Sequence, residues 1–157
     1  MDSVKFEVFE EGPWEGYMRF ILPRKTHFAR TIINGRSILE YIKECEQPLI
    51  QYRAGRYMDQ FAGVLYRYLT DMDYRLDGEI ALLICDNCLE EECYPIYARI
   101  DETPNVVTWS NFYNPFICKD SSDENFKPYH IAPFHFARDE FEKAVRKLGE
   151  QLQGERE

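Results

Sequence analysis

The chain has 157 residues, of which 45% are hydrophobic and 30% are charged. This balance excludes a disordered chain, and the length is that of one domain that builds its own hydrophobic core. Asp and Glu outnumber Lys and Arg by 28 to 19, which gives a net charge of −9 at pH 7 and disfavours nucleic acid as a partner because like charges repel.

The N-terminal residues and the cysteines predict the location of the protein. Residues 1–7 lack the basic start and apolar run of a secretion signal. No stretch of the sequence reaches the roughly 18 uncharged apolar residues of a membrane helix. The five cysteines are odd in number and unevenly spaced, which favours free thiols over a disulfide framework. We therefore expect a cytoplasmic protein with reduced cysteines and no membrane association.

The first third of the sequence predicts a β-hairpin. Residues 4–10 alternate apolar and charged side chains, which is typical of a strand with one solvated face. Residues 17–22 predict a second strand, and a turn with Gly and Pro separates the two, so we expect them to pair antiparallel. The segment 30–33 then ends at Asn34-Gly35, a dipeptide that favours a tight turn.

A helix is predicted from Ser37 to Cys45. Ser37 and Glu40 form a capping box, in which each side chain bonds an otherwise unpaired amide at the helix start. Apolar residues at helical spacing place Cys45 on the buried face. Residues 49–78 are ambiguous, because apolar side chains at helical spacing compete with two glycines that each weaken a helix by about 1 kcal/mol.

Three strands and a helix are predicted in the second half. A continuous apolar run over residues 80–85 predicts a strand covered on both faces. Residues 94–100 predict its return partner and residues 105–110 another strand, and together the three make a meander. Residues 119–127 are polar and predict an exposed loop. From Arg138 onwards, apolar residues at helical spacing predict a C-terminal helix.

These elements predict one α+β domain over residues 1–157. Its mainly antiparallel sheet would be packed by a helix from the N-terminal half and by the C-terminal helix. Polar composition predicts that the end of the chain, residues 153–157, frays.

Four segments, in this order, resemble sequence blocks of a known family. They are residues 33–40 (INGRSILE), 88–100 (CLEEECYPIYARI), 107–110 (VTWS) and 133–142 (PFHFARDEFE). The chain thus resembles an uncharacterised family of bacterial cytoplasmic proteins with the blocks NGRSLLE, CxCGExGCWPLxARI, VTW and GPFxFDRAQYE. The resemblance implies a bacterial cytoplasmic protein but no activity. The family's first cysteine and its helix-capping aspartate are replaced here by Asp86 and Ala137.

Cys85, Cys88 and Cys93 are the candidate metal ligands. A Cys-x2-Cys pair at the end of a strand can hold zinc, and a third thiolate five residues later can join it. The fourth ligand would come from one of three distant residues: Cys118, His130 or His135. The second Cys-x2-Cys pair of a zinc ribbon is missing, and the neighbouring carboxylates disfavour a redox role because they raise thiol pKa values. Purely structural cysteines are the alternative.

The sequence contains none of the common catalytic motifs. His27, His130 and His135 have no Ser or Cys nucleophile in a recognisable setting, and no phosphate loop, GxGxxG or HExxH is found. Carboxylates at Asp71 and Asp73, and again near residue 120, do not fit a calcium loop and are interpreted as solvated charge. An enzyme is therefore the third hypothesis.

Aromatic side chains gather around Pro115: Trp109, Phe112, Tyr113 and Phe116. If exposed among carboxylates, they would suit a basic protein partner; the alternative is a core role. The sequence thus favours a non-enzymatic acidic interaction module, similar to an inhibitor or immunity protein, without a cofactor. A zinc-binding protein that uses the three cysteines named above is the alternative function.

Overall fold

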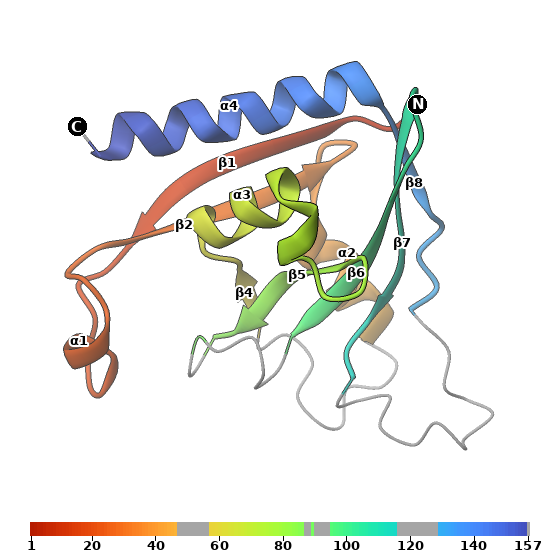
Figure 1. Ribbon diagram of the computed structural model, residues 1–157. Helices are drawn as coiled ribbons and strands as arrows, with labels where there is room; N and C mark the ends of the chain where they lie inside the picture. Colours follow the sequence, from red (N-terminus) through yellow and green to blue (C-terminus); the bar gives the residue numbers. More distant parts are fainter. Residues whose placement is uncertain (47–56, 87–88, 90–94, 116–128, 157) are drawn as a thin grey trace.

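The computed structural model describes residues 1–46, 57–86, 89, 95–115 and 129–156. Two antiparallel sheets and the helices packed on them form an α+β fold, which confirms the predicted fold class (Figure 1). The strand order is β1-β2-β3 in one sheet and β4-β5-β6-β7-β8 in the other. The two sheets meet where Asp2 bridges Phe136.

The first sheet is built on a long hairpin. β1 (Val4–Glu11) pairs antiparallel with β2 (Thr26–Ile33), and the short β3 (Arg36–Ser37) pairs with β2. The predicted strand over residues 4–10 is confirmed. The predicted strand over residues 17–22 is wrong, because this segment contains the short helix α1 (Met18–Ile21) at the end of the hairpin.

The turn between β2 and β3 lies at Asn34-Gly35, as predicted. The φ angles of 53° at Asn34 and 80° at Gly35 are both left-handed, which these two residue types tolerate best. The Asn34 side chain accepts a hydrogen bond from the Ser3 amide and donates one to the Asp2 carboxylate, each at 2.9 Å. The turn therefore holds the start of the chain in place.

The predicted helix after this turn is α2 (Ile38–Glu46). The Glu40 amide donates to Ser37 Oγ at 3.3 Å, which confirms the serine half of the capping box. The Glu40 carboxylate lies 3.6 Å from the Arg36 guanidinium. Cys45 is half-buried against the main core, and burial raises the pKa of its thiol.

The ambiguous region after α2 contains both kinds of element. β4 (Tyr57–Asp59) is followed by α3 (Ala62–Thr70) and by a 3-10 turn, η2 (Met72–Tyr74). The apolar residues at helical spacing begin with Met58, which lies on β4. The helical spacing is therefore confirmed only from Ala62 onwards. Strand pairing with the next strand therefore prevails over local periodicity at the start of this region.

The second sheet contains the predicted meander. Its remaining strands are β5 (Glu79–Cys85), β6 (Ile96–Glu102), β7 (Val106–Tyr113) and β8 (Phe134–Ala137), all paired antiparallel. Every residue of β5 after Glu79 is buried, as its apolar run predicts. The predicted loop over residues 119–127 lies outside the described residues.

The C-terminal helix α4 (Arg138–Arg156) runs along β1 and covers the junction of the two sheets (Figure 1). Its buried side chains have the predicted helical spacing: Phe141, Ala144, Val145 and Leu148. It extends to Arg156, within the segment that the sequence predicts to fray. No helix of the described residues is both long and apolar enough to cross a membrane.

One glutamine of α4 protects the outer edge of β1. Gln151 Oε1 accepts a hydrogen bond from the Val8 amide at 3.0 Å, and Gln151 Nε2 donates to the Phe6 carbonyl at 3.0 Å. The side-chain amide thus takes the place of a neighbouring strand at an edge that could otherwise pair with another chain.

Replacing Gln151 with alanine should lower the free energy of unfolding by about 1–3 kcal/mol, because two partly buried backbone groups lose their partner. Urea unfolding measures this loss, and hydrogen exchange at the Val8 amide should become faster. The matched control is Gln153→Ala, an exposed position on the same helix, which should change stability by less than about 0.5 kcal/mol. Equal stability of the two variants would contradict this role of Gln151.

Candidate functional site

Two of the predicted binding aromatics belong to the core. Trp109 and Phe112 are both 0% exposed, so neither can contact a partner in the folded protein. Asn111, with a φ of 54°, interrupts the alternation of β7, and this allows both rings to face inward. Tyr113 is half-buried and its hydroxyl donates to Glu79 Oε2 at 2.7 Å. Phe116 lies outside the described residues.

The structure places one of the three candidate metal ligands. Cys85 is buried at the end of β5, whereas Cys88 and Cys93 lie outside the described residues. Within the described ranges, no group of three or more His, Cys, Asp or Glu side chains could hold a metal ion. The zinc hypothesis stays a prediction.

Two histidines and the Asp71 carboxylate have local partners. His27 Nε2 lies 2.9 Å from Glu10 Oε1, and His135 Nδ1 lies 3.0 Å from Thr108 Oγ1. Asp71 caps η2 by accepting a hydrogen bond from the Asp73 amide at 3.0 Å. These contacts support a structural interpretation of these side chains.

A buried carboxylate that the sequence analysis missed lies at the end of α2. Glu46 is 0% exposed, and its Oε1 accepts hydrogen bonds from the hydroxyls of Tyr57 and Tyr129. Asn114 Nδ2 donates to the Tyr57 hydroxyl at 2.7 Å, and burial, with the hydrogen bond to Glu46, raises the pKa of Tyr57. Glu46 follows the buried Ile42 by four residues on the same helix, and this spacing could have indicated that it is buried. The cluster joins segments that are far apart in the sequence, so we interpret it as structural.

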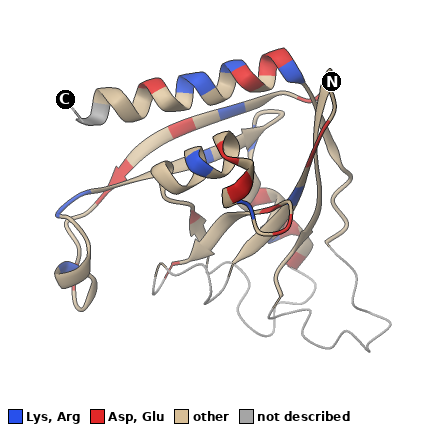
Figure 2. Ribbon diagram, in the orientation of Figure 1, with Lys and Arg blue, Asp and Glu red and all other residues tan. Residues whose placement is uncertain are grey.

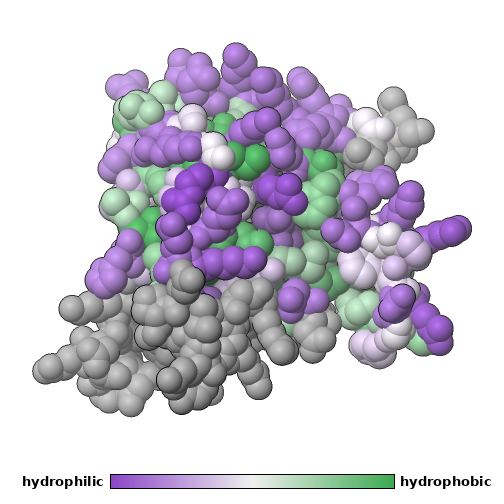
Figure 3. Space-filling view, turned by 180° about the vertical axis from the view of Figure 1, so that it is seen from behind, coloured by the Kyte–Doolittle hydropathy of each residue, from purple (hydrophilic) through white to green (hydrophobic). Residues whose placement is uncertain are grey.

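The end of the β1–β2 hairpin, residues 12–25, projects from the body of the protein (Figure 1; Figure 3, right). Gly12 makes this end possible, because its φ is 135° and a Cβ there would lie 2.3 Å from the Arg24 carbonyl oxygen. Trp14 Nε1 donates to Thr26 Oγ1 at 3.2 Å.

A small apolar cluster anchors the hairpin end. Its buried members are Phe28, Ile84 and Leu89, and the partly buried side chains packed on it include Trp14, Met18 and Leu22. The Trp14 ring meets Phe28 edge-on at a centroid distance of 6.0 Å. Met18 begins α1 and Leu22 follows it, whereas Trp14 precedes the helix. All three side chains pack on this cluster, which fixes the inner side of the turn.

The opposite face of this turn is exposed. Tyr17 is 75%, Phe20 74% and Ile21 53% exposed, and their spacing of three and four residues places them side by side. The other exposed large hydrophobic residues of the described chain lie outside the hairpin end: Met1, Met72 and Leu76. The hairpin end therefore concentrates exposed apolar surface at one place.

The charge of the hairpin end is opposite to that of the whole chain. Residues 12–25 contain Arg19, Arg24 and Lys25 but only one carboxylate, that of Glu15. The Arg19 guanidinium lies 4.6 Å from the centre of the Phe20 ring, and basic residues are visible at this end in Figure 2. The surface is thus aromatic with a basic border, on a chain whose net charge is −9.

No protein-family model, curated protein or solved structure matches the chain. The candidate site is therefore described by its own geometry: three exposed apolar side chains on a turn whose other face is fixed to the body. The signal for it in the sequence is the helical spacing of Tyr17, Phe20 and Ile21, which the prediction of a strand over residues 17–22 overlooked.

Proposed function

We propose that the protein is a non-enzymatic interaction module that docks on another protein through the hairpin end. The observation that carries this proposal is the joint exposure of Tyr17, Phe20 and Ile21. Exposed apolar side chains that are contiguous, rather than scattered, are typical of interaction surfaces, and aromatic residues are frequent energetic anchors in them.

The anchoring of the hairpin end supports the same proposal. Trp14, Met18 and Leu22 hold the inner face of the turn against the small apolar cluster. A surface that is already ordered loses less conformational entropy when it binds, so more of the contact energy is kept as affinity.

The partner's contact surface should complement the hairpin end. Charges more than about 8 Å apart are largely screened at physiological salt, so distant carboxylates contribute little here. Lys25 pairs with Glu10 at 3.6 Å, which leaves Arg19 and Arg24 as the cations offered to a partner. They favour an apolar surface bordered by carboxylates. A basic partner, which the net charge of −9 predicts, would use the other, acidic faces of the molecule.

Photo-crosslinking in the cell tests the docking surface. A photoreactive phenylalanine analogue at Phe20 should give discrete adducts with another protein. The same analogue at Leu76, which is 47% exposed and lies outside the hairpin end, is the matched control and should not give those adducts.

The pair of substitutions Tyr17→Ser and Ile21→Ser should reduce the adducts at position 20 by about tenfold or more, because anchors of this kind contribute about 2 kcal/mol or more to binding. Both side chains are exposed, so thermal unfolding should be unchanged. Identical adducts from positions 20 and 76, or adducts insensitive to the double substitution, would contradict the proposal.

A further inference from the structure

A groove lies between α3 and α4, away from the hairpin end. Its volume is about 410 Å³, within the range of about 300–1,000 Å³ that is typical of ligand sites. Its apolar lining includes Tyr66, Leu69 and Phe141. Its charged lining consists of three arginines and two glutamates: Arg75, Arg138, Arg146, Glu102 and Glu142.

Arg75 is the most unusual of these residues, because its side chain is only 4% exposed. Its Nε donates to the Tyr68 carbonyl at 2.8 Å, and its Nη2 donates to Glu102 Oε1 at 3.3 Å. A guanidinium has five N–H donors, and within the described part of the chain Nη1 of Arg75 has no acceptor. An oxygen supplied by a ligand could therefore accept a hydrogen bond from Nη1, and hydrogen bonds from a charged donor are stronger than neutral ones.

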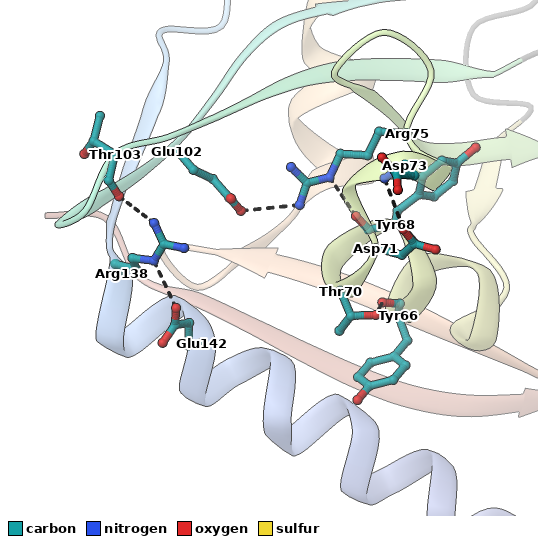
Figure 4. A network of polar contacts seen from close by, with 10 residues as sticks. All are labelled: Tyr66, Tyr68, Thr70, Asp71, Asp73, Arg75, Glu102, Thr103, Arg138 and Glu142. Carbon is teal, nitrogen blue, oxygen red and sulfur yellow. Dashed lines mark hydrogen bonds and ion pairs between the residues drawn. The ribbon is translucent and has the colours of Figure 1, made fainter.

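Arg138 is held beside the same groove. Its Nε donates to Glu142 Oε1 at 3.0 Å and its Nη1 donates to the Thr103 carbonyl at 2.8 Å. Figure 4 shows Glu102 between Arg75 and Arg138. These contacts fix the orientation of both guanidinium groups before any ligand binds, which favours affinity.

The charged side chains that line the groove favour an anion. The third arginine, Arg146, is exposed and forms no ion pair with any described residue. Three arginines and two glutamates leave one positive charge, on a chain that is otherwise acidic. A net charge of this sign attracts an anion.

We propose that this groove binds a carboxylate that is attached to an apolar group. The planar guanidinium matches the two oxygens of a carboxylate, and charge-assisted hydrogen bonds of this kind are stronger than neutral ones. The side chains of Tyr66, Leu69 and Phe141 would contact the apolar part. The ligand is either a free acid or the C-terminal end of a peptide, since both present the same chemistry.

Nuclear magnetic resonance titration with two pairs of probes tests this site. The first pair is 3-phenylpropionate and its neutral amide, and the second is an acetylated tripeptide ending in phenylalanine, as the acid and as the amide. In at least one pair, the acid should bind about tenfold or more tightly than the amide and shift the Nε–Hε signals of the groove arginines. The pair that binds more tightly identifies the source of the carboxylate.

Two matched variants locate the binding. Arg146→Gln should weaken binding of the preferred acid about fivefold or more, and because this side chain is exposed the fold should be retained. Arg99→Gln is the control, because Arg99 pairs with Asp101 on β6 and does not line the groove. Equal binding of acid and amide, absence of shifts at millimolar probe, or equal weakening by both variants would overturn the proposal.

Discussion

Replacing Trp109 with alanine should lower the free energy of unfolding by about 3–5 kcal/mol, the usual cost of truncating a fully buried aromatic side chain. Trp109 is 0% exposed. Its ring lies 6.3 Å from Phe6, 5.5 Å from Phe136 and 5.9 Å from Phe141, measured between centroids. Its indole N–H has no hydrogen-bond partner among the described residues, so the expected loss is one of packing.

The three ring neighbours of Trp109 explain why the effect should be large. Phe6 lies on β1, Phe136 on β8 and Phe141 on α4, so a cavity at Trp109 separates both sheets and the helix that covers them. Surrounding side chains cannot fill such a cavity without moving a whole element.

Urea unfolding, followed by far-UV circular dichroism, measures the effect. Phe20→Ala is the control, because this ring is 74% exposed and its removal should change stability by less than about 0.5 kcal/mol. If Trp109 instead served a partner surface, its variant would be as stable as the control, and that result would contradict the core position.

The periodicity of apolar residues in the sequence predicted the elements that bury one face and those that bury both faces. β1 has a buried Phe6 in an alternating pattern, β5 is a continuous apolar run, and α4 buries residues spaced by three and four. In each case the local pattern and the tertiary packing agree, so the sequence alone was sufficient for these elements.

Residues 17–22 show why other elements could not be predicted. Their apolar side chains fit a strand as well as a helical turn, and contacts distant in sequence decide between them. Met18 and Leu22 pack on the small apolar cluster that contains Phe28, and Phe20 is left exposed. The exposure of the side chains at the candidate site thus depends on contacts with residues distant in sequence, and the local sequence pattern does not reveal these contacts.

Asp59 should make the stability of the protein depend on pH in an unusual direction. It is 5% exposed on β4, and Arg30 Nε is 3.6 Å from its Oδ2, while Oδ1 has no hydrogen-bond partner in the described part of the chain. Burial raises the pKa of Asp59 to about 6, although Arg30 opposes the shift. The ordinary value, which applies to the unfolded chain, is 3.8.

Between these two pKa values the folded protein keeps a proton that the unfolded chain has released. Raising the pH therefore favours unfolding, and the stability that Asp59 contributes falls by about 3 kcal/mol between about pH 4 and about pH 6. In Asp59→Asn this residue cannot ionise. The variant should thus gain stability relative to the wild-type protein by about 3 kcal/mol across the same interval.

Removing the neighbouring cation, Arg30, provides a control that should extend the pH dependence of stability, whereas Asp59→Asn should remove it. Because the charge of Arg30 lowers the pKa of Asp59, Arg30→Gln should raise it further and extend the loss of stability to higher pH. Urea unfolding of the three proteins from about pH 4 to about pH 7 measures both effects. If the stability of wild type and Asp59→Asn changed in parallel with pH, the buried carboxyl group would not be the cause. If Arg30→Gln narrowed the interval, the assigned role of the arginine would be wrong, because its positive charge can only favour the ionised form of Asp59.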